Sequence, residues 1–185
     1  VTENTQGTGA GAAVLFRRTA GVWAQEQVIR ASDGVAGAHF GTDVAVAGDT
    51  VVATASDRGT IQADSGAAYV YTRTGAGADP WVEQAILENP DDNPGSQEYF
   101  GRSVDSQPGE IAVAAWNGYS GLGGVHVFQG SGDTWTHTQL LSEPSVSSAN
   151  EGIDLALSGN TLIASAFFNG TQGTAEVYLR TGGAW

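Results

Sequence analysis

Aspartates near two Phe-Gly pairs come closest, of all side chains in this sequence, to an acid-base arrangement. Asp43 follows Phe40 by three residues, and Asp105 follows Phe100 by five. Two facing carboxylates supply the acid and the base in most glycoside hydrolases. Because the two spacings differ, the aspartates are not equivalent positions of one pattern, and we expect no catalytic residues.

The three histidines form no recognisable catalytic or metal-binding set. A hydrolytic triad needs a histidine beside a nucleophile, and a zinc site needs three or four spaced ligands. His39, His126 and His137 fall at unrelated positions. His126 occupies the place in a predicted strand that Tyr69 occupies in an earlier, similar strand. This correspondence predicts that His126 packs in the core.

Two groups of acidic residues lie in predicted loops. Asp91, Asp92 and Asn93 are consecutive, so their side chains point in different directions, and a solvated turn explains them without a metal ion. Asp57 and Asp64 bracket another loop, across which they can meet. We predict no metal site, and retain Asp57 as a candidate for contact with a ligand.

Aromatic residues in the predicted loops are the main candidates for ligand binding. Trp116 has no tryptophan counterpart in the similar segments, and Tyr119 shares its loop. An exposed Trp/Tyr pair is suited to stacking on a sugar ring or to anchoring a protein. Alternatively, Trp116 packs within its own sheet, and Phe167 and Phe168 pose the same question. The predicted ligand-binding residues are Trp116, Tyr119, Tyr99 and Asp57.

The composition excludes several classes of protein. The chain of 185 residues carries 20 acidic residues against seven arginines, and its net charge of -13 repels the phosphates of nucleic acids. No stretch approaches the roughly 20 apolar residues of a membrane span. The chain has no cysteine, which excludes a disulfide scaffold. Because methionine is absent even from position 1, we expect a processed chain or a segment of a longer one.

One phrase recurs four times, as GAAVLF, GAAYVY, GGVHVF and GTAEVY. Its first glycines are spaced by 55, 57 and 50 residues, and each copy ends on an aromatic residue that a tryptophan follows. Several landmarks that recur together at one period indicate an internal repeat. The landmarks are Gly11, Phe16 and Trp23; Gly66, Tyr71 and Trp81; Gly123, Phe128 and Trp135; Gly173, Tyr178 and Trp185. The recurring aromatic residues are predicted to be core.

Each repeat contains four short segments with the composition of β-strands and no helical pattern. The first segment ends at a tight turn, predicted at Gly48 with Asp49, at Gly109 with Glu110 and at Gly159 with Asn160. The second, at residues 51–55, is apolar, as in a strand covered on both faces. The repeated phrase is the third segment, and the tryptophan begins the fourth.

Four antiparallel strands at a period of about 40–55 residues are typical of a β-propeller blade. A β-sandwich also has regularly spaced strands, but it need not repeat its sequence. We therefore predict an all-β fold, a β-propeller of four-stranded antiparallel blades. Along the chain we expect two strands first, then two complete four-stranded blades, and finally three strands. The predicted domain is one segment over residues 1–185, with units at 11–65, 66–122, 123–172 and 173–185.

The Phe-Gly pairs at 40–41 and 100–101, with the segments FGRSV and GAAYVY, resemble the FG-GAP repeat family. Such repeats build the propeller of integrin α subunits and occur in many bacterial extracellular proteins. The chain is most similar to bacterial repeats that carry an additional Trp strand. The resemblance implies a secreted, extracellular or cell-surface location. It also implies a ring of about seven blades, completed by further blades of a longer chain or by self-association.

Calcium is the cofactor that the resemblance brings into question. Integrin-type blades bind calcium in an Asp-x-Asp-x-Asp-Gly loop between their first two strands. Here the corresponding segment is the turn at Gly48 and Asp49, which cannot supply the about six to eight oxygen ligands of calcium. The third Phe-Gly pair is likewise replaced, by Glu151 and Gly152. We expect no cofactor.

Two sets of loops break the repeat and, in a propeller, lie on one face. Binding sites on repeat scaffolds are usually found in such loops. We expect a non-catalytic extracellular or cell-surface propeller that binds protein or glycan, with no nucleic-acid partner. The alternatives are a glycosidase or lyase with a site in the propeller funnel, and a structural subunit of a surface assembly. The loops are residues 31–39, 56–65, 88–99, 116–122, 142–151 and 167–172.

Overall fold

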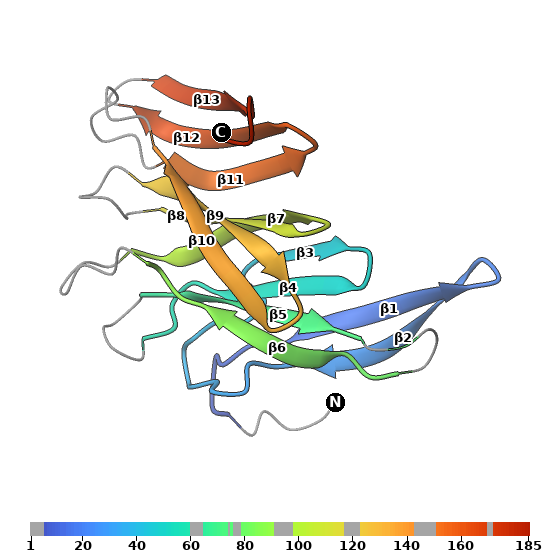
Figure 1. The fold of residues 1–185 in the computed structure, drawn as a ribbon. Coiled ribbons are helices and arrows are strands. Elements are labelled where there is room, and N and C mark those ends of the chain that lie inside the picture. Colours follow the sequence, from blue (N-terminus) through green and yellow to red (C-terminus); the bar gives the residue numbers. More distant parts are fainter. Residues whose placement is uncertain are drawn as a thin grey trace.

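The computed structural model describes residues 6–59, 65–73, 75, 79–90, 98–116, 123–142, 151–169 and 172–185. Over these residues the fold consists of 13 β-strands in four antiparallel sheets of two, four, four and three strands. The sheets stack in chain order, as propeller blades do (Figure 1). The predicted all-β, blade-like fold and the predicted strand numbers are confirmed. The four sheets of the described chain do not close a ring.

We number the sheets I to IV. Sheet I contains β1 (Ala13–Thr19) and β2 (Val22–Ile29). Sheet II contains β3 (Val44–Ala47), β4 (Thr50–Ala55), β5 (Ala67–Thr72) and β6 (Val82–Leu87). Sheet III contains β7 (Phe100–Gln107), β8 (Glu110–Ala115), β9 (Gly124–Ser131) and β10 (Thr134–Leu141). Sheet IV contains β11 (Glu151–Ser158), β12 (Thr161–Asn169) and β13 (Gln172–Leu179). Within each sheet every strand pairs with the next one along the chain, so β3, β7 and β11 form edges, which we call the inner edges.

Two-residue turns join the first two strands of sheets II to IV. The turns at residues 48–49 and 159–160 agree with the sequence prediction. In sheet III the register places the turn at residues 108–109, so the prediction that Glu110 is a turn residue is wrong. Glu110 begins β8, and its buried carboxylate accepts a hydrogen bond from Arg180 of sheet IV. This pairing between sheets requires Glu110 to lie inside the strand.

Apolar cores lie between neighbouring sheets, one for each pair. The Phe of each Phe-Gly pair occupies the same place in two of them. Phe40 packs edge-on against Tyr69, with ring centroids 5.3 Å apart, and Phe100 packs edge-on against His126 at 5.5 Å. His126 is buried, so its predicted packing is confirmed.

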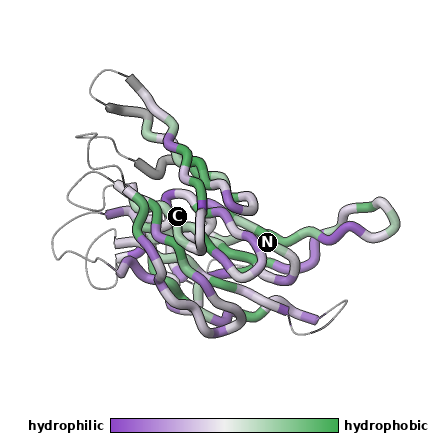
Figure 2. The backbone as a smooth tube through the Cα atoms, turned by 45° about the horizontal axis from the view of Figure 1, so that its top comes forward, coloured by the Kyte–Doolittle hydropathy of each residue, from purple (hydrophilic) through white to green (hydrophobic). Residues whose placement is uncertain are grey.

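Sheet I departs from the predicted burial of the recurring aromatic residues. Trp81 of sheet II is 7% exposed, whereas its counterpart Trp23 is 65% exposed, and Phe16 is exposed as well. Trp81 packs toward sheet I, but no described sheet covers the corresponding face of sheet I. The β1–β2 hairpin projects from the stack, while hydrophobic residues run along the strands where sheets pack (Figure 2). Trp23 and Phe16 are therefore exposed because no described sheet covers them, and not because of their residue type.

A close contact between backbones joins consecutive sheets at the glycine that begins the repeated phrase. Gly11 forms a parallel bridge with Phe40, and Gly66 forms one with Phe100. Both glycines have positive φ angles, of 87° and 80°. A Cβ atom on Gly66 would lie 1.9 Å from the carbonyl oxygen of Phe100, and one on Gly11 would lie 2.1 Å from that of Phe40. We call this the glycine contact, and it explains why the repeated phrase begins with glycine.

Hydrogen bonds beside the glycine contact reinforce it. The amide N–H of Phe40 donates to the carbonyl oxygen of Ala10 at 2.8 Å. In the next unit the N–H of Phe100 donates to the carbonyl oxygen of Ser65 at 3.2 Å. The starts of sheets II and III are thereby bonded to the chain just before β1 and β5, the strands of the preceding sheet that carry the repeated phrase.

Glutamine side chains join the outer strands of some sheets. The amide of Gln27 donates to the carbonyl oxygen of Trp81 at 2.9 Å and accepts from its N–H at 2.8 Å. Gln139 makes the same two bonds to Trp185, at 3.0 and 3.1 Å. Sheet II has Ala85 at this position and therefore lacks the bridge to sheet III. The glycine contact therefore joins sheets II and III, between which the glutamine bridge is absent.

The Gly66→Ala variant tests the glycine contact. Its methyl group would overlap a backbone oxygen that cannot move without separating two sheets, and its φ is unfavourable for alanine. We expect the free energy of unfolding to fall by about 3 kcal/mol or more, measured by urea denaturation.

Gly48→Ala is the matched control. Gly48 also has a positive φ, of 60°, but no atom lies within 4 Å of a Cβ placed there. We expect a loss of about 1 kcal/mol from backbone conformation alone. Equal losses for the two variants would contradict the account, because steric overlap would then contribute nothing.

Candidate functional site

The described residues that directly follow β2, β4 and β6 lie at one end of the sheets, on the left of Figure 1. Arg58, which follows β4, donates a hydrogen bond to Asp33 at 3.0 Å and another to Glu88 at 3.0 Å. Asp33 lies between sheets I and II, and Glu88 lies between sheets II and III. The expectation that the two loop sets share a face holds for these residues. We call this end the loop face.

Arg58 is the buried anchor of the loop face. Its guanidinium lies 5.9 Å from the centre of the Tyr69 ring, and the Tyr69 hydroxyl donates to Asp33 at 2.7 Å. The carbonyl oxygen of Arg58 accepts from the N–H of Gly66 at 2.8 Å. Burial, together with the hydrogen bond to Asp33, raises the pKa of Tyr69 well above its ordinary value. The hydroxyl therefore stays protonated and remains a donor. A charge-paired arginine thus ties the loop to the glycine contact.

Tyr99 and Trp116, two of the predicted ligand-binding residues, lie together on the loop face. Tyr99 directly precedes Phe100, and Trp116 directly follows β8. Their ring centroids are 5.3 Å apart, and the rings are tilted by 45°. Both residues are half-buried. The indole Nε1 of Trp116 is buried and has no hydrogen-bond partner among the described residues. The arrangement is an aromatic platform with one unused donor.

Asp57, a third predicted residue, forms a corresponding pair in the preceding unit. Its carboxylate bonds to Nδ1 of His39, which directly precedes the Phe-Gly pair as Tyr99 does. His39 is exposed, and Asp57 is half-buried. Tyr119, the fourth predicted residue, lies outside the described residues. In both units the residue before Phe-Gly contacts a residue just after the second strand, a carboxylate in one unit and an indole ring in the next, although Asp57 lies one position further along than Trp116.

Backbone conformation sets the position of both side chains that precede a Phe-Gly pair. His39 has a φ of 54° and Tyr99 has a φ of 49°, in the left-handed region that is uncommon for residues other than glycine. Such strain costs on the order of 1–3 kcal/mol and persists where the surroundings impose it. Sequence reasoning placed His39 in a loop of this face but missed it as a candidate site residue. Its position before Phe-Gly was the available signal.

Asp43 and Asp105 are bound to backbone groups on the inner edges of the sheets. Asp43 accepts from the N–H of Val44 at 2.8 Å and from the N–H of Val104 at 2.8 Å. Asp105 accepts from the N–H of its neighbour in β7, and from the N–H of Leu157 at 2.7 Å. The turn positions align Asp43 with Ser103, so the two aspartates are not equivalent. Carboxylates held by two backbone donors are poorly suited to acid-base catalysis.

The described residues contain no group of three or more histidines and acids that is suited to holding a metal ion. At the turn that corresponds to the calcium loop of the resembled family, Asp49 forms an ion pair with Arg73 at 2.8 Å. A single paired carboxylate does not fit calcium, which needs six or more oxygens. The predicted turn at Asp91, Asp92 and Asn93 and the residue Asp64 lie outside the described residues.

The comparison with protein families identifies one part of the chain. Residues 23–71 match the FG-GAP repeat. This segment is an FG-GAP repeat. It runs from β2 through β5, so the FG-GAP sequence repeat spans the outer part of one sheet and the inner part of the next. No curated protein matches the chain.

The glycine contact gives the FG-GAP pattern a physical meaning in this chain. The Phe-Gly pair at 40–41 lies inside the matched segment, and the same contact recurs at Phe100. Within the described residues, no helix has the length and hydrophobicity needed to cross a membrane. The chain therefore carries a propeller-like stack of sheets, of which residues 23–71 match the FG-GAP repeat.

A pair of histidines, the buried His126 and the half-buried His137, lies beside the core between sheets II and III, away from the loop face. Nδ1 of His126 lies 3.3 Å from Nε2 of His137, and Phe100 and Phe128 flank the two rings. Burial, and secondarily the charge of His137, lowers the pKa of His126 from 6.5 to about 3. His126 is therefore neutral in the folded protein at physiological pH.

This pair predicts a specific dependence of stability on pH. The unfolded chain takes up a proton on His126 below its ordinary pKa of 6.5, while the folded chain does so only near pH 3. The stabilisation that the folded protein gains from a neutral His126 is therefore fully present above pH 6.5, and it is lost as the pH falls toward 3. At pH 5 the free energy of unfolding should be about 2 kcal/mol lower for this reason.

Urea denaturation of the wild type and of His126→Phe between pH 5 and 8 measures the effect. Phenylalanine retains the aromatic packing that Tyr69 provides in the preceding unit, but it does not titrate. We expect the free energy of unfolding to depend less steeply on pH in the variant than in the wild type. Carboxylates contribute equally to the two proteins in this range. Parallel curves would show that His126 does not carry the pH dependence.

Proposed function

We propose that the chain is a non-catalytic propeller module that binds a glycan or protein ligand on its loop face, at Tyr99 and Trp116. The observation that carries the proposal is the pairing of these two half-buried rings outside the strands. The aromatic residues inside sheets II and III pack in the cores between blades. This pair lies where ligand-binding loops usually lie on repeat scaffolds.

The chemistry of the pair supports recognition of a sugar ring or of an apolar side chain. Aromatic faces stack on the C–H groups of a sugar and contribute large contact area with little loss of conformational entropy. The Nε1–H of Trp116 is buried without a partner among the described residues, which costs about 1–3 kcal/mol. A ligand hydroxyl or carbonyl oxygen that reached this donor would recover that cost.

We also propose an extracellular or cell-surface setting and a role in adhesion. FG-GAP repeats are typical of such proteins, and the chain contains one. An excess of acids over bases, with a net charge of -13, keeps the surface soluble and disfavours nucleic acid. A carbohydrate-active enzyme is disfavoured, because Asp43 and Asp105 are bonded to backbone donors.

Trp116→Ala and Tyr99→Ala test the proposal on a glycan array, followed by affinity measurement on each glycan bound. We expect either variant to weaken binding by about tenfold or more, since an aromatic anchor contributes on the order of 1–3 kcal/mol. An array of purified surface-protein ectodomains tests the protein alternative with the same variants.

Trp23→Ala is the matched control, because Trp23 is an exposed tryptophan of sheet I and lies in β2, outside the loop face. Its binding should equal that of the wild type. Equal loss in all three variants would refute a site at the loop face. Silence of the wild type on both arrays would favour a structural subunit of a surface assembly.

A further inference from the structure

Arg102, which directly follows the Phe-Gly pair at 100–101, is exposed, and its guanidinium bonds to no described residue. The chain holds 20 acidic residues against seven arginines, so a carboxylate partner is available to most of its arginines. At the same place β3 has Thr42 and β11 has Ile153, so of the three described inner strands only β7 carries a charge there. The arginines that form ion pairs with carboxylates are Arg17, Arg58, Arg73 and Arg180.

The backbone places Arg102 beside the aromatic pair of the proposed function, Tyr99 and Trp116. The N–H of Arg102 donates to the carbonyl oxygen of Tyr99 at 3.1 Å. Phe100 pairs with Ala115, so Trp116, the next residue, lies at the same end of the β7–β8 ladder. The backbones of the arginine and of both aromatic residues therefore meet at the loop face.

The preceding unit shows where a side chain at this position lies. Oγ1 of Thr42 donates to the carbonyl oxygen of His39 at 2.8 Å and lies 3.3 Å from Oγ of Ser56. His39 precedes Phe-Gly as the tyrosine of the aromatic pair does, and Ser56 directly follows β4 as the tryptophan directly follows β8. The side chain after Phe-Gly thus lies between these two positions, and Arg102 holds the same place in sheet III.

This end of sheet III offers a ligand three kinds of contact. Tyr99 and Trp116 supply aromatic rings, and Nε1 of Trp116 is a donor without a partner among the described residues. Arg102 adds a planar set of N–H donors whose spacing matches the two oxygens of a carboxylate. Because the protein leaves this cation without an acidic partner, we expect the ligand to bring the carboxylate.

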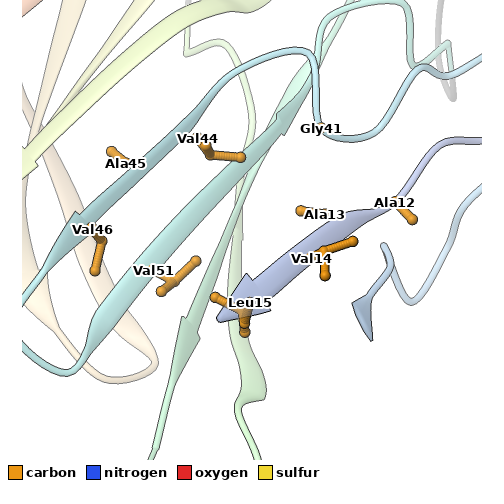
Figure 3. Close-up of a pocket in the computed structure, with 9 residues that line it drawn as sticks. All are labelled: Ala12, Ala13, Val14, Leu15, Gly41, Val44, Ala45, Val46 and Val51. Carbon is orange, nitrogen blue, oxygen red and sulfur yellow. The ribbon is translucent and has the colours of Figure 1, made fainter. Parts of the chain in front are cut away.

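A second hollow in the molecule has no such chemistry. A groove of about 240 Å³ lies between β1 on one side and β3 and β4 on the other (Figure 3). The side chains that line it are all aliphatic. It offers a ligand neither a charge nor a polar side chain, so a carboxylate is recognised at Arg102 and not there.

A hexuronic acid residue carries all three complementary groups on one rigid ring, namely an apolar C–H face, hydroxyl groups and a carboxylate. A peptide would need an apolar side chain, a carbonyl oxygen and an acidic side chain from several residues, and would lose more conformational entropy on binding. A chain of many anionic sugars is repelled by the net charge of -13. A single uronic acid among neutral sugars is therefore the best match.

We propose that Tyr99, Trp116 and Arg102 form a binding site for one hexuronic acid residue of a glycan. The rings stack on the sugar, the indole N–H donates to a hydroxyl oxygen, and the guanidinium binds the carboxylate through two N–H groups. This inference rests on the proposed function, because it uses the same aromatic pair, and it adds the charge of the ligand.

Matched trisaccharides are the probes. Each contains one glucuronic, galacturonic or mannuronic acid, and its counterpart contains the neutral hexose, glucose, galactose or mannose, at the same place. Titration calorimetry should show that the intact chain binds at least one uronic acid probe about tenfold or more tightly than its neutral counterpart, because a hydrogen bond to a charged acceptor is stronger than one to a neutral acceptor. Absence of any such preference would overturn the proposal.

Variants of the chain assign the preference to Arg102. Arg102→Gln should bring the ratio of the two affinities close to one without changing the unfolding midpoint, because the side chain is exposed. Arg102→Lys should restore only part of the preference, since an ammonium group keeps the charge but lacks the planar fork. Arg18→Gln, at an exposed arginine of β1, changes the net charge equally and is the matched control. Equal loss in Arg18→Gln and Arg102→Gln would refute a local site.

This proposal and the proposed function fail separately. If Trp116→Ala weakens binding while Arg102→Gln leaves the ratio of affinities unchanged, the aromatic site stands and the uronic acid proposal is wrong. If Trp116→Ala changes the affinity for neither kind of probe, the proposed function fails as well. Binding of a purified acidic ectodomain that Arg102→Gln abolishes, with no uronic acid probe bound, would make a protein the ligand and overturn the proposal.

Discussion

The backbone contact between a glycine and the following Phe-Gly pair is the constraint on which the rest of the structure depends. With no Cβ at Gly66, the carbonyl of Phe100 lies where a side chain would otherwise be. That approach sets the spacing of neighbouring sheets, and the Phe ring fills the gap that the spacing leaves. It also fixes the residue before Phe, because His39 and Tyr99 adopt a left-handed conformation to reach the contact. One steric requirement therefore links the core of the stack to the loop face.

The same constraint fixes some positions of each unit and leaves others free to vary. The ion pair of Arg58 with Asp33 joins the two loops that contain them, but the residue before Phe-Gly differs from unit to unit and brings different partners to the loop face. On the inner edge, aspartates at two alternating levels satisfy the outward N–H groups of two sheets at once. Carboxylates used in this way stabilise the stack, which is why acidic residues near the propeller axis are no sign of catalysis here.

The sequence was sufficient to predict the number and order of strands, because a repeat of fixed period places each strand by its landmarks. It also predicted the packing of His126, from the correspondence with Tyr69. It did not reveal the pairs His39 with Asp57 and Arg58 with Asp33, which join segments 18 and 25 residues apart through side-chain geometry. The exposure of Trp23 was missed for another reason. Residue type predicts burial only when the neighbouring sheet is present, and the place of Glu110 likewise followed from a partner in sheet IV.

Native-state hydrogen exchange of the amides of Phe40 and Phe100 tests the central claim most directly. Both amides donate across the glycine contact, to Ala10 and Ser65. If the contact holds neighbouring sheets together, these two amides exchange only when the whole stack unfolds, with a free energy equal to that of global unfolding. Amides at the outer edge of β2 exchange through smaller openings. Exchange of Phe40 and Phe100 at the rate of those edge amides would show that the sheets separate freely at this point, and would contradict the account.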